Sequence, residues 1–231
     1  MKPVLAFDVG STNIKTTLFD MNTMTVLAWH LHEYELIVQD GFIENRPADW
    51  WTGIKLGIRD VLEQTGLHPQ KILGLTFCAQ MQGLVLVDRD GNALRNSISY
   101  LDGRATAIFD KFMRKGLFKI EGMNARKILS SLWITNGAAA SSKDPLWKLH
   151  WVREHQPNLF ENVYKWIDVK DFLVAKCTGR ICTTPDSAHL TFLYDFRKKQ
   201  DGWNRTLCKM FEVDMALLPE VVSGTDIVGE L

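Results

Sequence analysis

The stretch "LAFDVGSTNIKTTLFD", residues 5–20, decides the fold and raises the first question about function. Apolar residues alternate with other residues on both sides of the short segment DVGST, residues 8–12. A period of two is typical of β-strands, so the stretch predicts two strands joined by a turn. This turn carries a carboxylate, a glycine and two hydroxyls, with an ammonium close behind, which is more polar chemistry than a simple hairpin needs.

The polar groups of this turn suit a phosphate. Gly10 lets the backbone turn without a Cβ atom and allows a phosphate to approach closely. Backbone N–H groups and the hydroxyls of Ser11 and Thr12 can donate to phosphate oxygens. Lys15 adds positive charge, and Asp8 can hold Mg²⁺ through water, because this ion keeps most of its hydration shell. The other interpretation is an ordinary hairpin whose Asp and Ser side chains cap their own backbone. Neither GxxxxGK[ST] nor GxGxxG is present in the stretch.

The composition of the whole chain limits the classes of partner. Its 231 residues are enough for a substantial core, and its 27 Lys+Arg balance its 27 Asp+Glu. A zero net charge gives no basic field for nucleic acid or for an anionic membrane surface. No apolar run approaches the roughly 20 residues that span a bilayer. The N-terminus enters a predicted strand without a secretory signal, so we expect a cytoplasmic protein that binds neither nucleic acid nor membrane.

Hydrophobic spacing predicts the order of the remaining elements. Residues 24–36 read as a third strand, which predicts an antiparallel meander. A helix is predicted from Pro47 to a stop at Gly66, because apolar residues recur at helical spacing between them. Two strands follow, within residues 72–80 and 83–94. Helices are then predicted within residues 103–116, from Pro145 to residue 155, and within residues 169–179. This order predicts a mixed sheet covered by helices.

Several separated stretches resemble one known family. "FDVGSTNIKTTLFD", residues 7–20, is similar to the first phosphate motif of the actin/hexokinase/Hsp70-type ATPases. The remaining matches resemble carbohydrate kinases of the FGGY family, with the xylulokinases nearest. They are "GFIENRPADWW" at residues 41–51, "AQMQGLVLVDRDGNALRNSISYLDGRA" at 79–105, "DPLWKLHWVREH" at 144–155 and "VKDFLVAKCTGR" at 169–180. The matches cover essentially the whole chain in the expected order.

The resemblance implies a fold, two cofactors and one half of an active site. The fold is α/β, a ribonuclease H-like domain of the actin/hexokinase type with a mixed β-sheet flanked by helices. The implied cofactors are ATP and Mg²⁺. Asp8 matches the family's metal-serving carboxylate, and the phosphate-facing positions fall on Gly10, Ser11, Thr12, Asn13 and Lys15.

The implied sugar site rests on two further matches. Met81 and Gln82 stand where xylulokinases have Met-His, and Gln82 can exchange hydrogen bonds with hydroxyls but cannot become a cation. Tyr100, Asp102 and Arg104 match the family's W-x-D-x-R, and in an extended segment this spacing places all three on one face. The other interpretation of these residues is an Asp–Arg pair that organises a loop.

One expected part of the enzyme has no counterpart within residues 1–231. The family's general-base Asp lies in a Gly-Asp-Asn/Gln motif that opens a second domain, and neither form occurs in this sequence. We therefore expect residues 1–231 to be the N-terminal domain alone, inactive by itself, with the base and the nucleotide-binding domain beyond Leu231.

The partner implied for the full-length enzyme is a small-molecule sugar. A ketopentose such as xylulose is the first candidate, followed by a related ketose or a polyol. The alternative function is a non-catalytic sugar-binding or regulatory module, and a homodimer is compatible with either function.

Overall fold

The computed structural model describes residues 1–197 and 202–230. The chain forms two compact units, each of which is assembled from two segments. Unit 1 contains Met1–Ile37 and Asn45–Gln80, and unit 2 contains Val38–Glu44 and Met81–Leu231. In the part of the chain that the structure describes, no helix combines the length and apolar character needed to cross a membrane.

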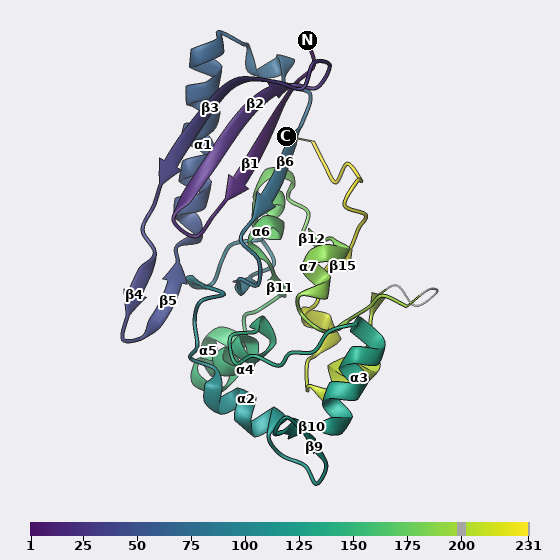
Figure 1. Ribbon diagram of the computed structural model, residues 1–231. Helices are drawn as coiled ribbons and strands as arrows, with labels where there is room; N and C mark the ends of the chain where they lie inside the picture. The colour runs from purple at the N-terminus through teal and green to yellow at the C-terminus, as the bar shows by residue number, and fades with distance from the viewer. Residues whose placement is uncertain (198–201, 231) are drawn as a thin grey trace. The chain divides into compact units, whose positions relative to one another are not determined.

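Unit 1 is built on a four-stranded sheet in the order β3–β2–β1–β6 (Figure 1). Its strands are β1 (Pro3–Val9), β2 (Asn13–Asp20), β3 (Thr25–Glu33) and β6 (Leu75–Ala79). β1 pairs antiparallel with β2, and β2 pairs antiparallel with β3, which confirms the predicted meander. Because β6 runs parallel to β1, the sheet is mixed, as the sequence predicts.

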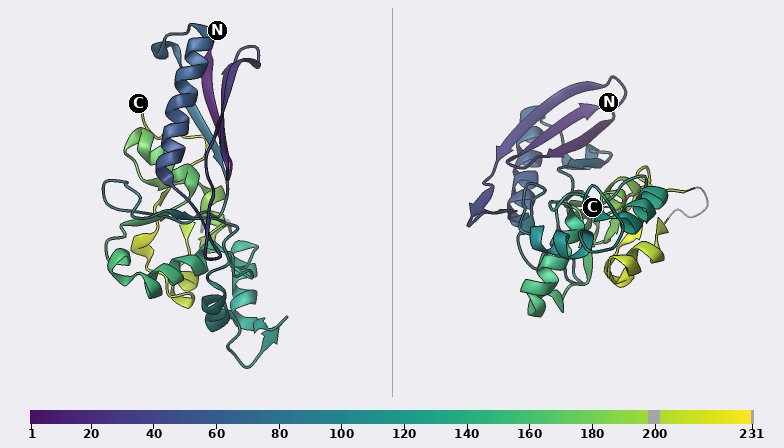
Figure 2. Two further views of the ribbon diagram at one scale, coloured as in Figure 1. Left: turned by 90° about the vertical axis from the view of Figure 1, so that its left-hand side faces the viewer. Right: turned by 60° about the horizontal axis from the view of Figure 1, so that its bottom comes forward.

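Helix α1 (Pro47–Thr65) lies along one face of this sheet, as the left view of Figure 2 shows. Proline stands at its start, and the chain leaves the helix through Gly66 in a left-handed conformation with φ 64°. Two helical glycines let α1 approach the sheet. A Cβ atom on Gly57 would lie 2.1 Å from the Thr16 hydroxyl, so the backbone itself packs on β2 there.

Short strands and helices make up the rest of the chain. In order they are β4 (Ile37–Gln39), β5 (Phe42–Asn45), β7 (Val85–Val87), β8 (Ser97–Ile98), α2 (Thr106–Met113), β9 (Lys119–Ile120), β10 (Met123–Asn124), α3 (Ala125–Thr135), α4 (Pro145–His155), α5 (Pro157–Phe160), β11 (Lys165–Ile167), α6 (Val169–Thr178), β12 (Cys182–Thr183), α7 (Pro185–His189), β13 (Tyr194–Asp195), β14 (Gly202–Trp203), α8 (Arg205–Met210) and β15 (Glu220–Val221). Two single-turn 3₁₀ helices lie at Pro69–Lys71 and Met215–Leu217.

The core of unit 2 surrounds Trp147 on α4, which is fully buried. Its indole contacts the rings of Phe109, Phe112 and Phe211, with ring centroids 5.6 to 5.7 Å apart. These rings come from α2, from α4 and from the end of α8, so one aromatic cluster joins elements that are distant in sequence. Helix α4 lies where the sequence predicts a helix, from Pro145 to residue 155, and most of its residues are buried.

Candidate functional site

The turn between β1 and β2 has all three of its carbonyl groups bonded to unit 1. The Tyr34 hydroxyl donates to the Gly10 oxygen, and the Tyr34 backbone N–H donates to the Thr12 oxygen at 2.9 Å. Between them, the Ser11 oxygen accepts a hydrogen bond from the Asn45 side-chain amide at 3.0 Å. The carbonyl dipoles of the turn, which would repel an anion, are therefore held by protein donors.

The N–H groups of Ser11 and Thr12 have no acceptor among the residues that the structure describes. In a trans peptide the carbonyl and the following N–H point in opposite directions. Holding the Gly10 and Ser11 oxygens against the protein therefore directs the next two N–H groups away from it. Ser11 is partly exposed and Thr12 is exposed, so both donors are available to an anion such as a phosphate.

Gly10 has a different role from the one that turn geometry suggested. Its N–H donates to the Asn13 oxygen at 2.8 Å, which closes the turn. Its φ is not positive, and an added Cβ atom would meet its nearest neighbour, the Asn13 oxygen, at 3.4 Å. The expectation that the turn needs glycine for its conformation is therefore wrong. What remains is the open approach that glycine gives to a ligand.

Asp8 and Lys15 face each other across β1 and β2. Both side chains are exposed, on the face of the sheet opposite to Val9 and Ile14, which are buried. No ion pair joins the two among the described residues, so carboxylate and ammonium are both available. In the same part of the chain no group of three His, Cys, Asp or Glu side chains could hold a metal ion. An exposed carboxylate such as Asp8 is the kind of group that can hold a Mg²⁺ ion through its waters.

The predicted sugar contacts Met81 and Gln82 lie in unit 2, directly after β6. Met81 is 63% exposed, so it is not a core residue. Gln82 has φ 60°, a left-handed conformation that is uncommon for a residue other than glycine. The next residue, Gly83, donates its N–H to the Asp168 carboxylate at 3.2 Å. A Cβ atom on Gly83 would lie 2.8 Å from Val169, so glycine is required at this close approach.

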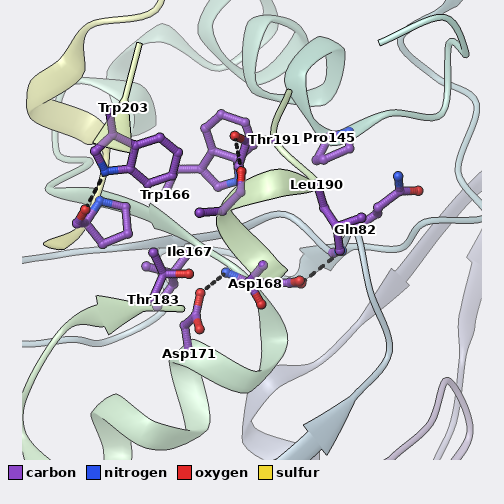
Figure 3. Close-up of a pocket in the computed structure, with 14 residues that line it drawn as sticks. Gln82, Pro145, Trp166, Ile167, Asp168, Asp171, Thr183, Leu190, Thr191 and Trp203 are labelled. Carbon is purple, nitrogen blue, oxygen red and sulfur yellow. Dashed lines mark hydrogen bonds between the residues drawn. The ribbon is translucent and has the colours of Figure 1, made fainter. Parts of the chain in front are cut away.

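A small cavity of about 20 Å³ lies next to this turn, which is room for one water molecule (Figure 3). Figure 3 shows the Gln82 side chain extending away from Asp168, with its amide at the outer end. Burial, followed by the neighbouring charge of Asp171, raises the pKa of Asp168 to about 7. Asp168 and Asp171 also form a reciprocal cap at the start of α6, the helix that the sequence predicts within residues 169–179.

Tyr100, Asp102 and Arg104 do not share one face, contrary to the expectation for an extended segment. The Asp102 N–H donates to the Ser99 oxygen at 3.1 Å, and this bond folds the segment into a turn. Tyr100 is 38% exposed, whereas Asp102 is fully buried and the Arg104 side chain is 1% exposed. Of the three, only Tyr100 is presented to solvent.

The Asp102 carboxylate bonds to groups of unit 2 itself. The Arg104 guanidinium donates to both carboxylate oxygens, at 2.9 and 2.8 Å, and the Ile43 N–H donates to one of them at 2.6 Å. Burial alone would raise the pKa of Asp102, but these hydrogen bonds outweigh burial and lower the pKa. The Arg104 guanidinium also bonds Glu44 at 2.8 Å. It lies over the Phe42 ring, with 4.0 Å between guanidinium carbon and ring centroid.

Lys148 on α4 holds the same loop from another side. Its side chain is fully buried, and its ammonium donates to the Ser99 oxygen at 2.7 Å. Burial lowers the pKa of Lys148 to about 8, against the opposing charges of Asp102 and Asp144. The Asp–Arg pair, Glu44 and Lys148 together give the loop the organised form that was the alternative interpretation of its sequence.

The structure therefore places the predicted residues in two groups. Asp8, Gly10, Ser11, Thr12, Asn13 and Lys15 all lie in unit 1, and Met81, Gln82, Tyr100, Asp102 and Arg104 all lie in unit 2. Sequence reasoning missed Tyr34 and Asn45, which hold the carbonyls of the first turn. Asn45 lies inside the quoted stretch "GFIENRPADWW". The motif therefore pointed to this region, but it did not reveal the hydrogen bond from Asn45 to Ser11.

Comparisons with known proteins cover nearly the whole chain. The model of the FGGY family of carbohydrate kinases, N-terminal domain, matches residues 3–231. The chain is 28% identical over 232 residues to the xylulose kinase of Bacillus subtilis, a match that covers 100% of the chain and 44% of that kinase. It is 24% identical to the glycerol kinase of Thermococcus gammatolerans, with 98% of the chain and 44% of that kinase covered.

A solved structure shows the same fold. The ligand-bound xylulose kinase from Lactobacillus acidophilus superimposes with a TM-score of 0.79 at 23% identity, covering 96% of this chain and 42% of that one. This likeness confirms the predicted α/β fold of the actin/hexokinase type. The chain spans less than half the length of these relatives.

Proposed function

Because this chain belongs to the FGGY family of carbohydrate kinases, we propose that the protein carrying it transfers a phosphoryl group from ATP to a hydroxyl of a small sugar. A ketopentose such as xylulose is the first candidate, since xylulose kinases are among the relatives. Glycerol kinases are also among them, which keeps polyols in the proposed range together with related ketoses.

One observation carries the proposal. The turn at residues 10–12 keeps its carbonyl oxygens on protein donors and leaves the Ser11 and Thr12 N–H groups without an acceptor among the described residues. An ordinary hairpin has no need to protect carbonyls in this way. A turn that stabilises negative charge does, because donors fixed in place before the reaction need no rearrangement when charge develops.

The residues around the turn supply the remaining chemistry. When bound, ATP provides the phosphoryl group and Mg²⁺ offsets part of its charge. Asp8 holds the waters of the metal, Lys15 contributes positive charge, and the Ser11 and Thr12 hydroxyls add to the backbone donors. Asn13 closes the turn on Gly10 and keeps the donors together.

The sugar side uses different chemistry. Met81 packs its exposed thioether on the carbon face of the sugar, and Gln82 exchanges hydrogen bonds with hydroxyls. Tyr100 offers a ring and a hydroxyl at the surface of unit 2. Asp102 and Arg104 serve this site by fixing the loop that presents Tyr100.

The general base is proposed to come from outside residues 1–231, in a second half like the one that the longer relatives have. On this basis the isolated chain binds sugar weakly and shows no turnover, since closure of a second domain contributes contacts and excludes water.

The proposal is tested by a substrate screen. The full-length protein is incubated with ATP, Mg²⁺ and a panel of ketopentoses, ketohexoses and polyols, and ADP release is coupled to an optical signal. We expect sugar-dependent ADP release that is confined to a few members of the panel. Calorimetric binding of a sugar without any ADP release would contradict the proposal and favour the non-catalytic binding module.

A further inference from the structure

Two side-chain amides connect the end of β6 to the phosphate-facing turn. The Gln80 amide donates to the Asn45 oxygen at 3.1 Å, and the Asn45 amide donates to the Ser11 oxygen at 3.0 Å. Asn45 is fully buried, and Gln80 is fixed further by its own N–H, which donates to the Val9 oxygen at 2.7 Å. All these residues belong to unit 1.

The chemistry of this chain of bonds allows only one orientation of Asn45. Its nitrogen must face Ser11, because a carbonyl oxygen can only accept, and its oxygen must face the Gln80 nitrogen. The Ser11 oxygen thus fixes which way the Asn45 amide points, and the Gln80 nitrogen holds the Asn45 oxygen in that orientation. Asn45 in turn decides which way the peptide between Ser11 and Thr12 points, and with it the direction of the free Thr12 N–H.

We propose that Asn45, anchored by Gln80, is a positioning residue that holds the Thr12 N–H toward the transferring phosphate. This inference rests on the proposed kinase function. Gln80 lies two residues before Gln82. One short segment therefore carries both a proposed sugar contact and the side chain that anchors Asn45 against the phosphate-facing turn.

The test replaces the amide by a carboxylate of the same shape. Asn45→Asp can still accept from Gln80 but, when ionised, cannot donate to the Ser11 oxygen. In the full-length enzyme at pH 8 we expect kcat/KM for ATP to fall about tenfold or more, since a lost donor misplaces the turn. KM for the sugar should stay within about twofold of the wild type, because the sugar contacts are not changed.

Asn124→Asp is the matched control. Like Asn45, Asn124 donates its amide to a backbone oxygen, of Lys115, while its own oxygen accepts, in this case from the backbone N–H of Lys127. The same chemical change therefore deletes the same kind of bond, but in unit 2 and at the start of α3. We expect wild-type values of both constants for this variant.

The pH dependence of activity distinguishes a positioning role of Asn45 from a role in stabilising the fold alone. Protonation gives the introduced carboxyl an O–H that can donate where the amide did, so the activity of Asn45→Asp relative to wild type should recover as pH falls from about 8 to about 5. A ratio of activities that stays constant over this range overturns the proposal, even if the variant is impaired.

Hydrogen exchange on the full-length protein gives a readout that does not depend on activity. The Gly10 N–H donates to the Asn13 oxygen and the Tyr34 N–H donates to the Thr12 oxygen, so both should exchange at least about tenfold faster in Asn45→Asp than in wild type. Unchanged exchange overturns the proposal. If the wild-type enzyme phosphorylates no sugar, the proposed function fails, and exchange alone then decides whether Asn45 orders the turn.

Discussion

Two short polar segments of this chain use their hydrogen-bonding groups in opposite ways. In the turn at residues 10–12 the backbone oxygens are bonded by unit 1, and the donors of Ser11 and Thr12 have no acceptor in the described part of the chain. In the loop at residues 99–104 the charged side chains of Asp102 and Arg104 bond each other and their neighbours. Donors without a protein acceptor indicate a place where a ligand can bind. An ion pair whose groups are all bonded to protein indicates a role in holding the fold. The sequence does not distinguish the two stretches, because both are rich in polar and charged residues.

The largest effect, a loss of unfolding free energy, is expected from removing the buried ion pair of the loop at residues 99–104. Asp102→Ala leaves Arg104 as a buried charge without its main partner, and the loss of one partner of such a pair costs about 3–5 kcal/mol of unfolding free energy. Denaturant unfolding of residues 1–231 measures it. The control, Asp110→Ala, removes a more exposed pair with Arg114 and should cost less than about 1 kcal/mol. Similar losses in both variants would show that the loop is not organised by its ion pair.

The second effect belongs to the ligand-facing turn. Asp8→Asn removes an exposed carboxylate with no ion-pair partner among the described residues, so the unfolding free energy should change by less than about 0.5 kcal/mol. In the full-length enzyme kcat should nevertheless fall by about 10²-fold or more, because the proposed role of Asp8 is to support the metal and the charge of the transition state. Steady-state kinetics with saturating ATP and sugar measures kcat. A kcat near that of the wild type would contradict the proposed role of Asp8 at the metal.

The third prediction concerns pH and the loop at residues 99–104. Burial lowers the pKa of Lys148 from 10.5 to about 8. Between these values the unfolded chain holds a proton that the folded chain has released, so stability should rise with pH there, by up to about 1 kcal/mol per pH unit.

Lys148→Met supplies the reference for this third prediction. The difference in unfolding free energy between wild type and variant isolates the ammonium from other titrating groups. We expect the difference to grow in favour of the wild type as pH rises from about 8 to about 10. A flat difference would mean that Lys148 titrates normally in the folded chain.

The smallest effect is expected at the proposed sugar contact, Gln82. On that proposal Gln82→Ala loses a hydrogen bond to a sugar hydroxyl, which contributes roughly 0.5–1.5 kcal/mol, so KM for the sugar should rise about two- to tenfold. KM for ATP should remain almost unchanged, which serves as the internal control. Equal effects on both substrates would instead give Gln82 a role in holding the strained turn that precedes Gly83.

Local sequence rules were sufficient for unit 1. Alternation predicted its first three strands, and Pro47 with Gly66 predicted both ends of α1. These signals are local because each concerns residues that neighbour one another in the chain. Helix α3 (Ala125–Thr135) was missed, although Asn124 caps it, since its apolar residues lie on both buried and exposed faces and give no clear helical stripe.

The candidate site was predictable as a set of residues but not as a set of contacts. The polar excess at residues 8–12 was visible in the sequence, whereas the bond from Asn45 to Ser11 spans 34 residues. The Asp102 carboxylate accepts a hydrogen bond from the Ile43 N–H, which lies 59 residues away. Such pairings are set by tertiary packing, so a spacing of two residues wrongly placed Tyr100, Asp102 and Arg104 on one face.

The segment Val38–Glu44 has a consequence for the order in which the chain matures. It is synthesised in the middle of unit 1 but belongs to unit 2, where Glu44 pairs with Arg95 and Arg104 and Phe42 packs on Trp151. On the ribosome, the sheet of unit 1 has all its strands once Gln80 has emerged. Its partners from unit 2 are made later, from β8 and the two arginines to Trp151, so Val38–Glu44 gains its full set of contacts only once Trp151 has emerged.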